Sequence, residues 1–130
     1  MPTGEFRSFL ERLLFPVHTY LVNKETGGLK SLRPKTIPVG IIYTMNCNKE
    51  LVEKYDYPRI LNVSVDNCKE VFGYSEALFA YNTYQFIDYS KYNIDLFDEK
   101  EKAKYRDEHF ATDLKSAFEL GKKLVSLNKD

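Results

Sequence analysis

The side chains best suited to ligand chemistry follow the most apolar stretch of the chain, residues 37–46. This stretch is rich in β-branched and aromatic residues and lacks strict alternation. It predicts a β-strand buried on both faces, as in a parallel sheet. Ligands of open α/β sheets bind beyond the carboxyl ends of the strands. We therefore expect Thr44, Met45, Asn46 and Cys47, at the end of this strand, to lie at a binding site.

The other reactive side chains are dispersed along the sequence. Cys47 and Cys68 form no Cys-x-x-Cys pair and have no histidine cluster near them, so we expect no metal or iron–sulfur site. A disulfide between them is one alternative; we favour two buried free thiols and a reducing, cytoplasmic location. His18 and His109 have no evident acid or nucleophile partner. We interpret both histidines as surface or packing residues.

The composition is that of one soluble domain over residues 1–130. Apolar residues make up 43% of the chain and charged residues 29%, which is ordinary for a globular protein. Because 19 basic residues balance 19 acidic ones, charge favours neither nucleic acid nor an anionic membrane as a partner. No run of about 18 apolar residues is present, so we expect no membrane-spanning segment.

The hydrophobic spacing predicts the elements that would position this site. A helix is expected after Thr3, which can cap its free amides, and residues 17–36 favour a small hairpin or an extended loop. The strand over 37–46 comes next, and it is followed by a helix from near residue 49, a helix over 59–72 and a strand over 77–86. The mixed-charge run over 98–107 is interpreted as a solvated helical face, and the last predicted helix covers 110–125. This helix–strand–helix–strand–helix order predicts an α/β fold with parallel strands.

Such a fold has too few strands for an independent sheet, since a stable domain usually has three or more. With a neighbour on one side only, the strand over 37–46 would leave the amides and carbonyls of its other edge unpaired. We therefore expect a homodimer in which this edge pairs with a second copy across a two-fold axis, which gives one continuous sheet.

Residues 1–12, Met-Pro-Thr-Gly-Glu-Phe-Arg-Ser-Phe-Leu-Glu-Arg, resemble a segment of the flavodoxin-like NAD(P)H-dependent FMN reductases. This group includes the WrbA-type quinone oxidoreductases and the iron–sulfur flavoproteins. In the family, a loop ending in Gly-Asn-Met/Ile, a small residue and Gly leads into a helix with the pattern x-Met-Arg/Lys-x-Phe-Leu/Ile-Asp/Glu-Arg. Here Met1 would occupy the Met/Ile position, and Phe6 replaces the usual Met.

The resemblance covers nearly the whole chain but only the carboxyl-terminal half of the family's fold. Residues 41–46 look like the fourth flavodoxin strand with its loop, residues 78–86 like the fifth strand, and residues 110–124 like the closing helix. The family's first three strands, its amino-terminal phosphate-binding loop and the aromatic loop before the Gly-Asn have no counterpart. The cysteine cluster of the iron–sulfur flavoproteins also has no counterpart in this sequence.

The resemblance implies an FMN-dependent oxidoreductase that passes hydride from NAD(P)H to the flavin and on to a quinone or a similar acceptor. It assigns Thr3 and Gly4, with Thr44, Met45 and Asn46, to the rim of the flavin ring or phosphate, where free amides at a helix start suit an anion. Without the resemblance, Thr3 is an N-cap and Asn46 a turn residue. The alternative function is a non-catalytic association domain that keeps this half of the fold and pairs through its open strand edge.

An aromatic group accompanies the second predicted strand and the residues after it. One interpretation is a stacking wall for a flavin, nicotinamide or quinone, with Tyr84 as a candidate cofactor-binding residue. The other, which we favour, is a set of packed tyrosines with solvated hydroxyls, or a subunit contact. The group comprises Tyr81, Tyr84, Phe86, Tyr89 and Tyr92.

Overall fold

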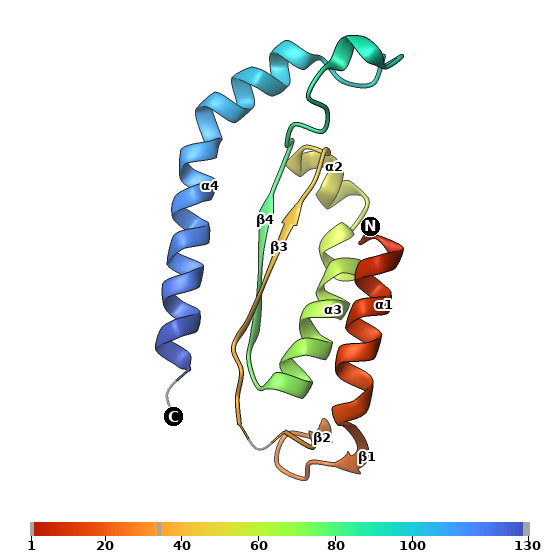
Figure 1. The fold of residues 1–130 in the computed structure, drawn as a ribbon, viewed down its shortest axis with the longest axis vertical. Helices are drawn as coiled ribbons and strands as arrows, with labels where there is room; N and C mark the ends of the chain where they lie inside the picture. The colour runs from red at the N-terminus through yellow and green to blue at the C-terminus, as the bar shows by residue number, and fades with distance from the viewer. Residues whose placement is uncertain (1, 34, 129–130) are drawn as a thin grey trace.

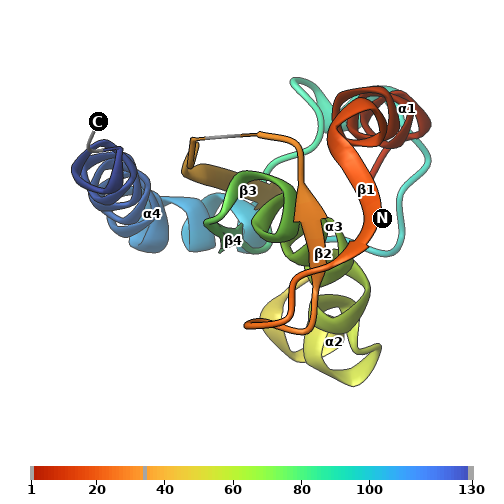
Figure 2. The ribbon, with the colours of Figure 1, turned by 90° about the horizontal axis from the view of Figure 1, so that it is seen from below.

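The computed structural model describes residues 2–33 and 35–128. They form a mixed α/β fold with a long helix on one face of a strand pair and two helices on the other (Figures 1 and 2). The elements in chain order are α1 (Gly4–Leu14), a 3₁₀ turn (Phe15–Val17), β1 (His18–Val22), β2 (Leu29–Ser31), β3 (Val39–Thr44), α2 (Lys49–Lys54), α3 (Tyr57–Phe72), β4 (Ser75–Ala80), a 3₁₀ turn (Tyr89–Lys91) and α4 (Glu99–Leu127).

The first helix, α1, begins where its cap predicts. The hydroxyl of Thr3 accepts a hydrogen bond from the amide of Phe6 at 3.3 Å. Leu14 is buried, and Phe6 and Leu10 pack against the core. Phe9, on the same helix, is 57% exposed, so the described residues cover only part of the apolar face of α1. Met1, the first residue of the family resemblance, lies outside the described residues.

The segment predicted as a hairpin or an extended loop is a hairpin. Strands β1 and β2 pair antiparallel, and the amide of Asn23 donates to the carbonyl of Gly28 at 2.7 Å across the turn. The amide of Leu29 donates to the Glu70 carboxylate at 2.6 Å, which ties the hairpin to α3. The hairpin lies beyond the amino ends of β3 and β4, away from the predicted site (Figure 1).

Strands β3 and β4 pair in parallel, with Val39 opposite Ser75 and Thr44 opposite Ala80. The prediction of a parallel strand pair is confirmed. The predicted bounds of the second strand, 77–86, are wrong, because β4 covers Ser75–Ala80 and Asn82 has a φ of 50°. A left-handed residue cannot continue an extended strand, so residues 81–86 form a loop.

The prediction that the central strand is buried on both faces is also wrong. Ile41 and Tyr43 point into the core, whereas Ile42, on the other face, is 52% exposed. Helix α4 lies against that other face near Gly40, where Leu124 and Leu120 come close. Burial along β3 therefore alternates, since one face has a full apolar layer and the other a partial one.

Helices α2 and α3 follow the predicted pattern closely. Oδ1 of Asn48 caps α2 by accepting from the amide of Leu51 at 2.9 Å. Helix α3 has a proline, Pro58, in its first turn and ends at Gly73, whose φ is 89°. The core between α1, α3 and the strand pair consists of Leu14, Ile41, Tyr43, Leu61, Val65, Cys68, Val71 and Phe72.

The mixed-charge run and the predicted last helix form one continuous helix, α4, capped by Asp98. The interpretation of residues 98–107 as a solvated face is wrong at Lys102, which is 2% exposed and points toward the loops that follow β3 and β4. Among the described helices, none is both long enough and apolar enough to span a bilayer.

Candidate functional site

A groove of about 1170 Å³ runs along the outer edge of β3, between that strand and α1. We call it the β3 groove. Within the described residues β3 pairs with β4 alone, so its other edge faces this groove without a strand partner. Its lining consists of Pro2, Thr3, Phe6, Phe9, Leu10, Leu13, Arg33, Ile37, Val39–Cys47, Tyr57, Leu61, Cys68, Phe72 and Thr83–Gln85.

The carboxyl end of the β3 groove brings together most of the predicted site residues. Thr44, Met45 and Asn46 line it from the end of β3, Thr3 from the start of α1, and Tyr84 from the loop after β4. Helix α1 begins at the end of the molecule where β3 and β4 finish (Figure 1). Gly4 is not part of the lining, and a side chain at Gly4 would meet no atom within 4 Å.

Backbone hydrogen bonds join the two loops that form this end of the groove. The amide of Thr83 donates to the Met45 carbonyl at 2.9 Å, and the amide of Asn82 donates to the Cys47 carbonyl at 2.9 Å. Oδ1 of Asn46 is buried and has no hydrogen-bond partner within the described part of the chain. A buried acceptor of this kind is costly unless a donor reaches it. Among the described residues that line the groove, Asn46 is the one with a buried side-chain oxygen that lacks a donor.

The predicted aromatic group packs largely against itself. Tyr84 meets the ring of Tyr89 edge to face at 5.2 Å, and its hydroxyl donates to the Glu99 carbonyl at 3.3 Å. Phe86 stacks on Tyr92 with their centroids 4.1 Å apart, and Tyr89 is buried. These contacts agree with the packing interpretation. Tyr84 still presents part of its surface to the β3 groove.

Lys102, from α4, is a site residue that sequence reasoning missed. Its ammonium donates to the Asn46 carbonyl at 3.0 Å, to Oδ1 of Asn82 at 2.9 Å and to the Thr83 carbonyl at 3.3 Å. Burial lowers the pKa of this lysine, and the nearby thiol of Cys47 opposes the shift. In a run of alternating charges, no local pattern distinguishes Lys102 from its solvated neighbours.

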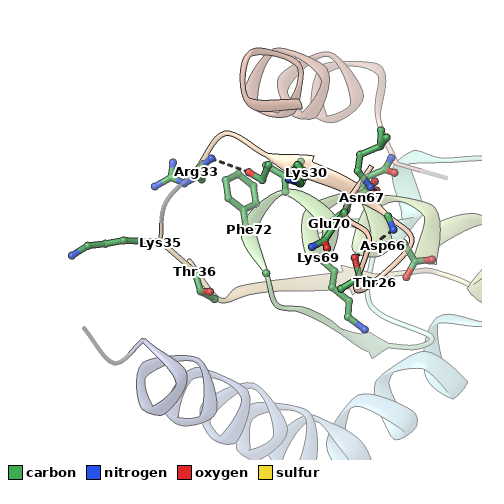
Figure 3. A pocket seen from close by; sticks show the side chains of 16 residues that line it. Thr26, Lys30, Arg33, Lys35, Thr36, Asp66, Asn67, Lys69, Glu70 and Phe72 are labelled. Atoms are coloured by element: carbon green, nitrogen blue, oxygen red, sulfur yellow. Dashed lines mark hydrogen bonds between the residues drawn. The ribbon is translucent and has the colours of Figure 1, made fainter. Parts of the chain in front are cut away.

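A second hollow, of about 710 Å³, lies between the β1–β2 hairpin and the carboxyl end of α3. Its lining mixes cationic and acidic side chains, among them Arg33, Lys35, Asp66 and Glu70. Figure 3 shows Arg33 and Lys35 extending to the side away from Asp66 and Glu70, so these charges do not converge on one point. This hollow has the character of a solvated polar surface rather than of a built ligand site.

The cysteines are free thiols, Cys68 buried and Cys47 half-buried, and burial raises the pKa of Cys68. No group of three or more His, Cys, Asp or Glu side chains within residues 2–33 and 35–128 is arranged to hold a metal ion.

Comparisons of the chain with protein-family models, with curated proteins and with solved structures found no match.

Proposed function

We propose that this chain is the carboxyl-terminal half of a flavodoxin-like unit that, as a homodimer, binds FMN at the carboxyl end of the β3 groove and acts as an NAD(P)H-dependent oxidoreductase. The observation that carries the proposal is the convergence of Thr3, Thr44, Met45, Asn46 and Tyr84 on one end of a groove. These residues come from three separate segments of the chain, and the family resemblance assigned all but Tyr84 to a flavin rim.

The residues at this end fit one wall of a flavin site. Asn46, Met45 and Tyr84 line this wall, and Met45 and Tyr84 offer apolar and aromatic surface. The amino end of α1, where Thr3 caps the helix, favours a negative charge. Among the described residues that line the groove, Arg33 is the cationic side chain, and it follows the hairpin near the amino end of β3. Firm binding of the phosphate therefore requires groups from the second copy in the homodimer.

When bound, FMN supplies the hydride chemistry, accepting from NAD(P)H and passing reducing equivalents to a quinone or a similar acceptor. The part of this chain is to bind and orient the ring and to keep water from one of its faces. The half-buried Met45 packs against the apolar core beneath the groove, and the hydrogen bond from Thr83 holds its carbonyl. Both contacts keep this wall in place before a ligand arrives.

Titration with FMN tests this function. The purified chain should quench flavin fluorescence to saturation, and riboflavin, which lacks the phosphate, should bind more weakly because the amino end of α1 favours the anion. Unchanged FMN fluorescence up to millimolar concentrations of protein, with the chain folded by circular dichroism, would contradict the proposal.

The second candidate function is an association domain without catalysis, favoured by the length of the β3 groove. The groove follows the edge from Ile37 to Cys47 rather than only its carboxyl end, and apolar side chains such as Phe9 and Ile42 flank it in the open. Pairing of this edge with that of a second copy would give one continuous sheet. A dimer that ignores FMN would favour this function, whereas a monomer in light scattering at micromolar concentration would contradict both.

A further inference from the structure

The ammonium of Lys102 is hydrogen-bonded by uncharged groups alone among the described residues. Its ammonium has three N–H donors, and they point to the carbonyls of Asn46 and Thr83 and to Oδ1 of Asn82. The ring of Phe97 lies 4.9 Å from the nitrogen. The residue is 2% exposed, so these contacts replace water. A buried lysine held by backbone carbonyls and an amide fixes the direction of each of those dipoles.

The groups that Lys102 holds belong to the two loops at the carboxyl end of the β3 groove. Asn46 follows β3, and Asn82 and Thr83 follow β4. The main-chain carbonyl of Asn46 accepts from Lys102, and this hydrogen bond fixes the orientation of the peptide. The Asn46 side chain, whose Oδ1 has no partner among the described residues, extends from that fixed backbone. The Thr83 carbonyl is fixed in the same way beside Tyr84. One ammonium thus orients both loops that carry candidate ligand contacts.

We propose that Lys102 is the positioning residue of this site: its ammonium sets the backbone of the loops that present Asn46 and Tyr84 to the groove. The inference deepens the proposed FMN function and rests on it for the identity of the ligand. The lysine does not line the groove and is not expected to touch the flavin. Its effect on binding is exerted through the loops.

The first test is amide hydrogen exchange by NMR in Lys102→Met, which keeps the length of the side chain and removes the donors. The amides of Asn82 and Thr83 report on the loops, and the amide of Val39, bonded to the Tyr74 carbonyl at 3.0 Å, reports on the other end of the strand pair. We expect protection of the two loop amides to fall by roughly tenfold or more relative to that of Val39, as for loss of hydrogen bonds to a charged group. Equal protection in variant and wild type would overturn the proposal.

A matched control separates positioning from general loss of stability. Val52 is fully buried in α2, and Val52→Ala should lower overall stability without changing the ratio of loop to Val39 protection. If Lys102→Met does not fold, Asn82→Gly serves instead, because it removes one acceptor of the ammonium and tolerates the positive φ. The same local loss of protection is expected there, and its absence would overturn the proposal.

The second test measures FMN affinity, and its outcomes distinguish a wrong role for Lys102 from a wrong proposed function. We expect Lys102→Met to raise the FMN dissociation constant by roughly tenfold while Val52→Ala leaves it unchanged. Equal affinity in Lys102→Met and wild type would overturn the positioning role. If the wild type itself does not bind FMN, the proposed function falls, and the exchange of the loop amides decides the role of Lys102.

Discussion

Gly40 of β3 lies directly beneath Leu124 of α4. A Cβ atom at Gly40 would come within 2.8 Å of Cδ1 of Leu124 and 3.2 Å of Cδ2 of Leu120. The absence of a side chain is what lets α4 approach the strand at this point. Helix α4 covers this face of the strand pair near Gly40, while Ile42 further along β3 is half exposed. The contact therefore fixes how close the long helix packs to the sheet.

Gly40→Ala should destabilise the fold by less than about 1 kcal/mol, because the atoms closest to the added methyl group are the side-chain ends of Leu124 and Leu120, which can move aside. The free energy of unfolding from urea titration measures the effect. Gly121→Ala is the matched control, since a side chain there would meet no atom within 4 Å and Gly121 lies inside α4. Alanine at that position should stabilise the helix by about 0.5–1 kcal/mol. Equal effects of the two substitutions would contradict the packing described.

A second contact between α4 and the strand pair predicts how stability changes with pH. The carboxylate of Glu76 on β4 accepts from the ammonium of Lys123 and from the hydroxyl of Tyr74. Lys123 and then Tyr74 lower the pKa of Glu76 from 4.5, so its contribution to stability is present above that value and is lost as pH falls through the lowered pKa. Glu76 and then Tyr74 raise the pKa of Lys123 from 10.5 to about 12, so its contribution is present below 10.5 and is lost as pH rises through about 12.

Thermal melts across pH measure this dependence, and Glu76→Gln should flatten both the acid and the alkaline limbs. Because both side chains are about half exposed, the amplitude should shrink in high salt. Glu119→Gln is the control, because the Glu119–Lys122 pair, at 3.2 Å, lies within α4 and joins nothing to the sheet. A pH profile of Glu76→Gln identical to that of the wild type would count against the linkage.

The features that the sequence predicts well are those set by near neighbours. Helix α1 begins at its Thr3 cap, and α3 runs to the glycine stop at Gly73, because apolar spacing and capping residues act over a few positions. The parallel pairing of β3 with β4 follows from the helices that separate them. The expectation that Thr3 and Asn46 lie at one site came from the family resemblance and not from the spacing of residues alone.

The features that the sequence does not reveal depend on distant contacts. The end of β4 is set by the left-handed Asn82, whose side chain is held by Lys102, 20 positions away. The burial of Lys102 depends on a carbonyl 56 positions away at Asn46. The exposure of Ile42 depends on how much of β3 the long helix α4 covers. The pattern of hydropathy along the chain does not predict these contacts.

Asn46→Ala should weaken FMN binding by roughly three- to tenfold, the effect of losing one hydrogen bond, and leave the fold intact. Asn46 lines the carboxyl end of the β3 groove, which is the reason to expect a ligand contact there. Asn48→Ala is the matched control, since Asn48 caps α2 through the Leu51 amide and does not line the groove. That variant should lose about 1 kcal/mol of stability and keep its FMN affinity. Unchanged FMN binding in Asn46→Ala would show that the site is assigned to the wrong residue.

If the proposed homodimer pairs through the edge of β3, Ile42→Pro should abolish it and leave the monomer folded. The amides of Ile37, Val39 and Met45 donate to carbonyls at the end of α3, just before β4 and at the end of β4, respectively. Because backbone groups alternate along a strand, the amide of Ile42 points to the open edge. Proline there removes a donor of that edge without breaking the β3–β4 ladder, and its fixed φ is compatible with an edge strand. Ile42→Ala, which shortens the side chain but keeps the amide, is the control and should remain dimeric in light scattering. A dimer that survives Ile42→Pro must use a surface other than the edge of β3.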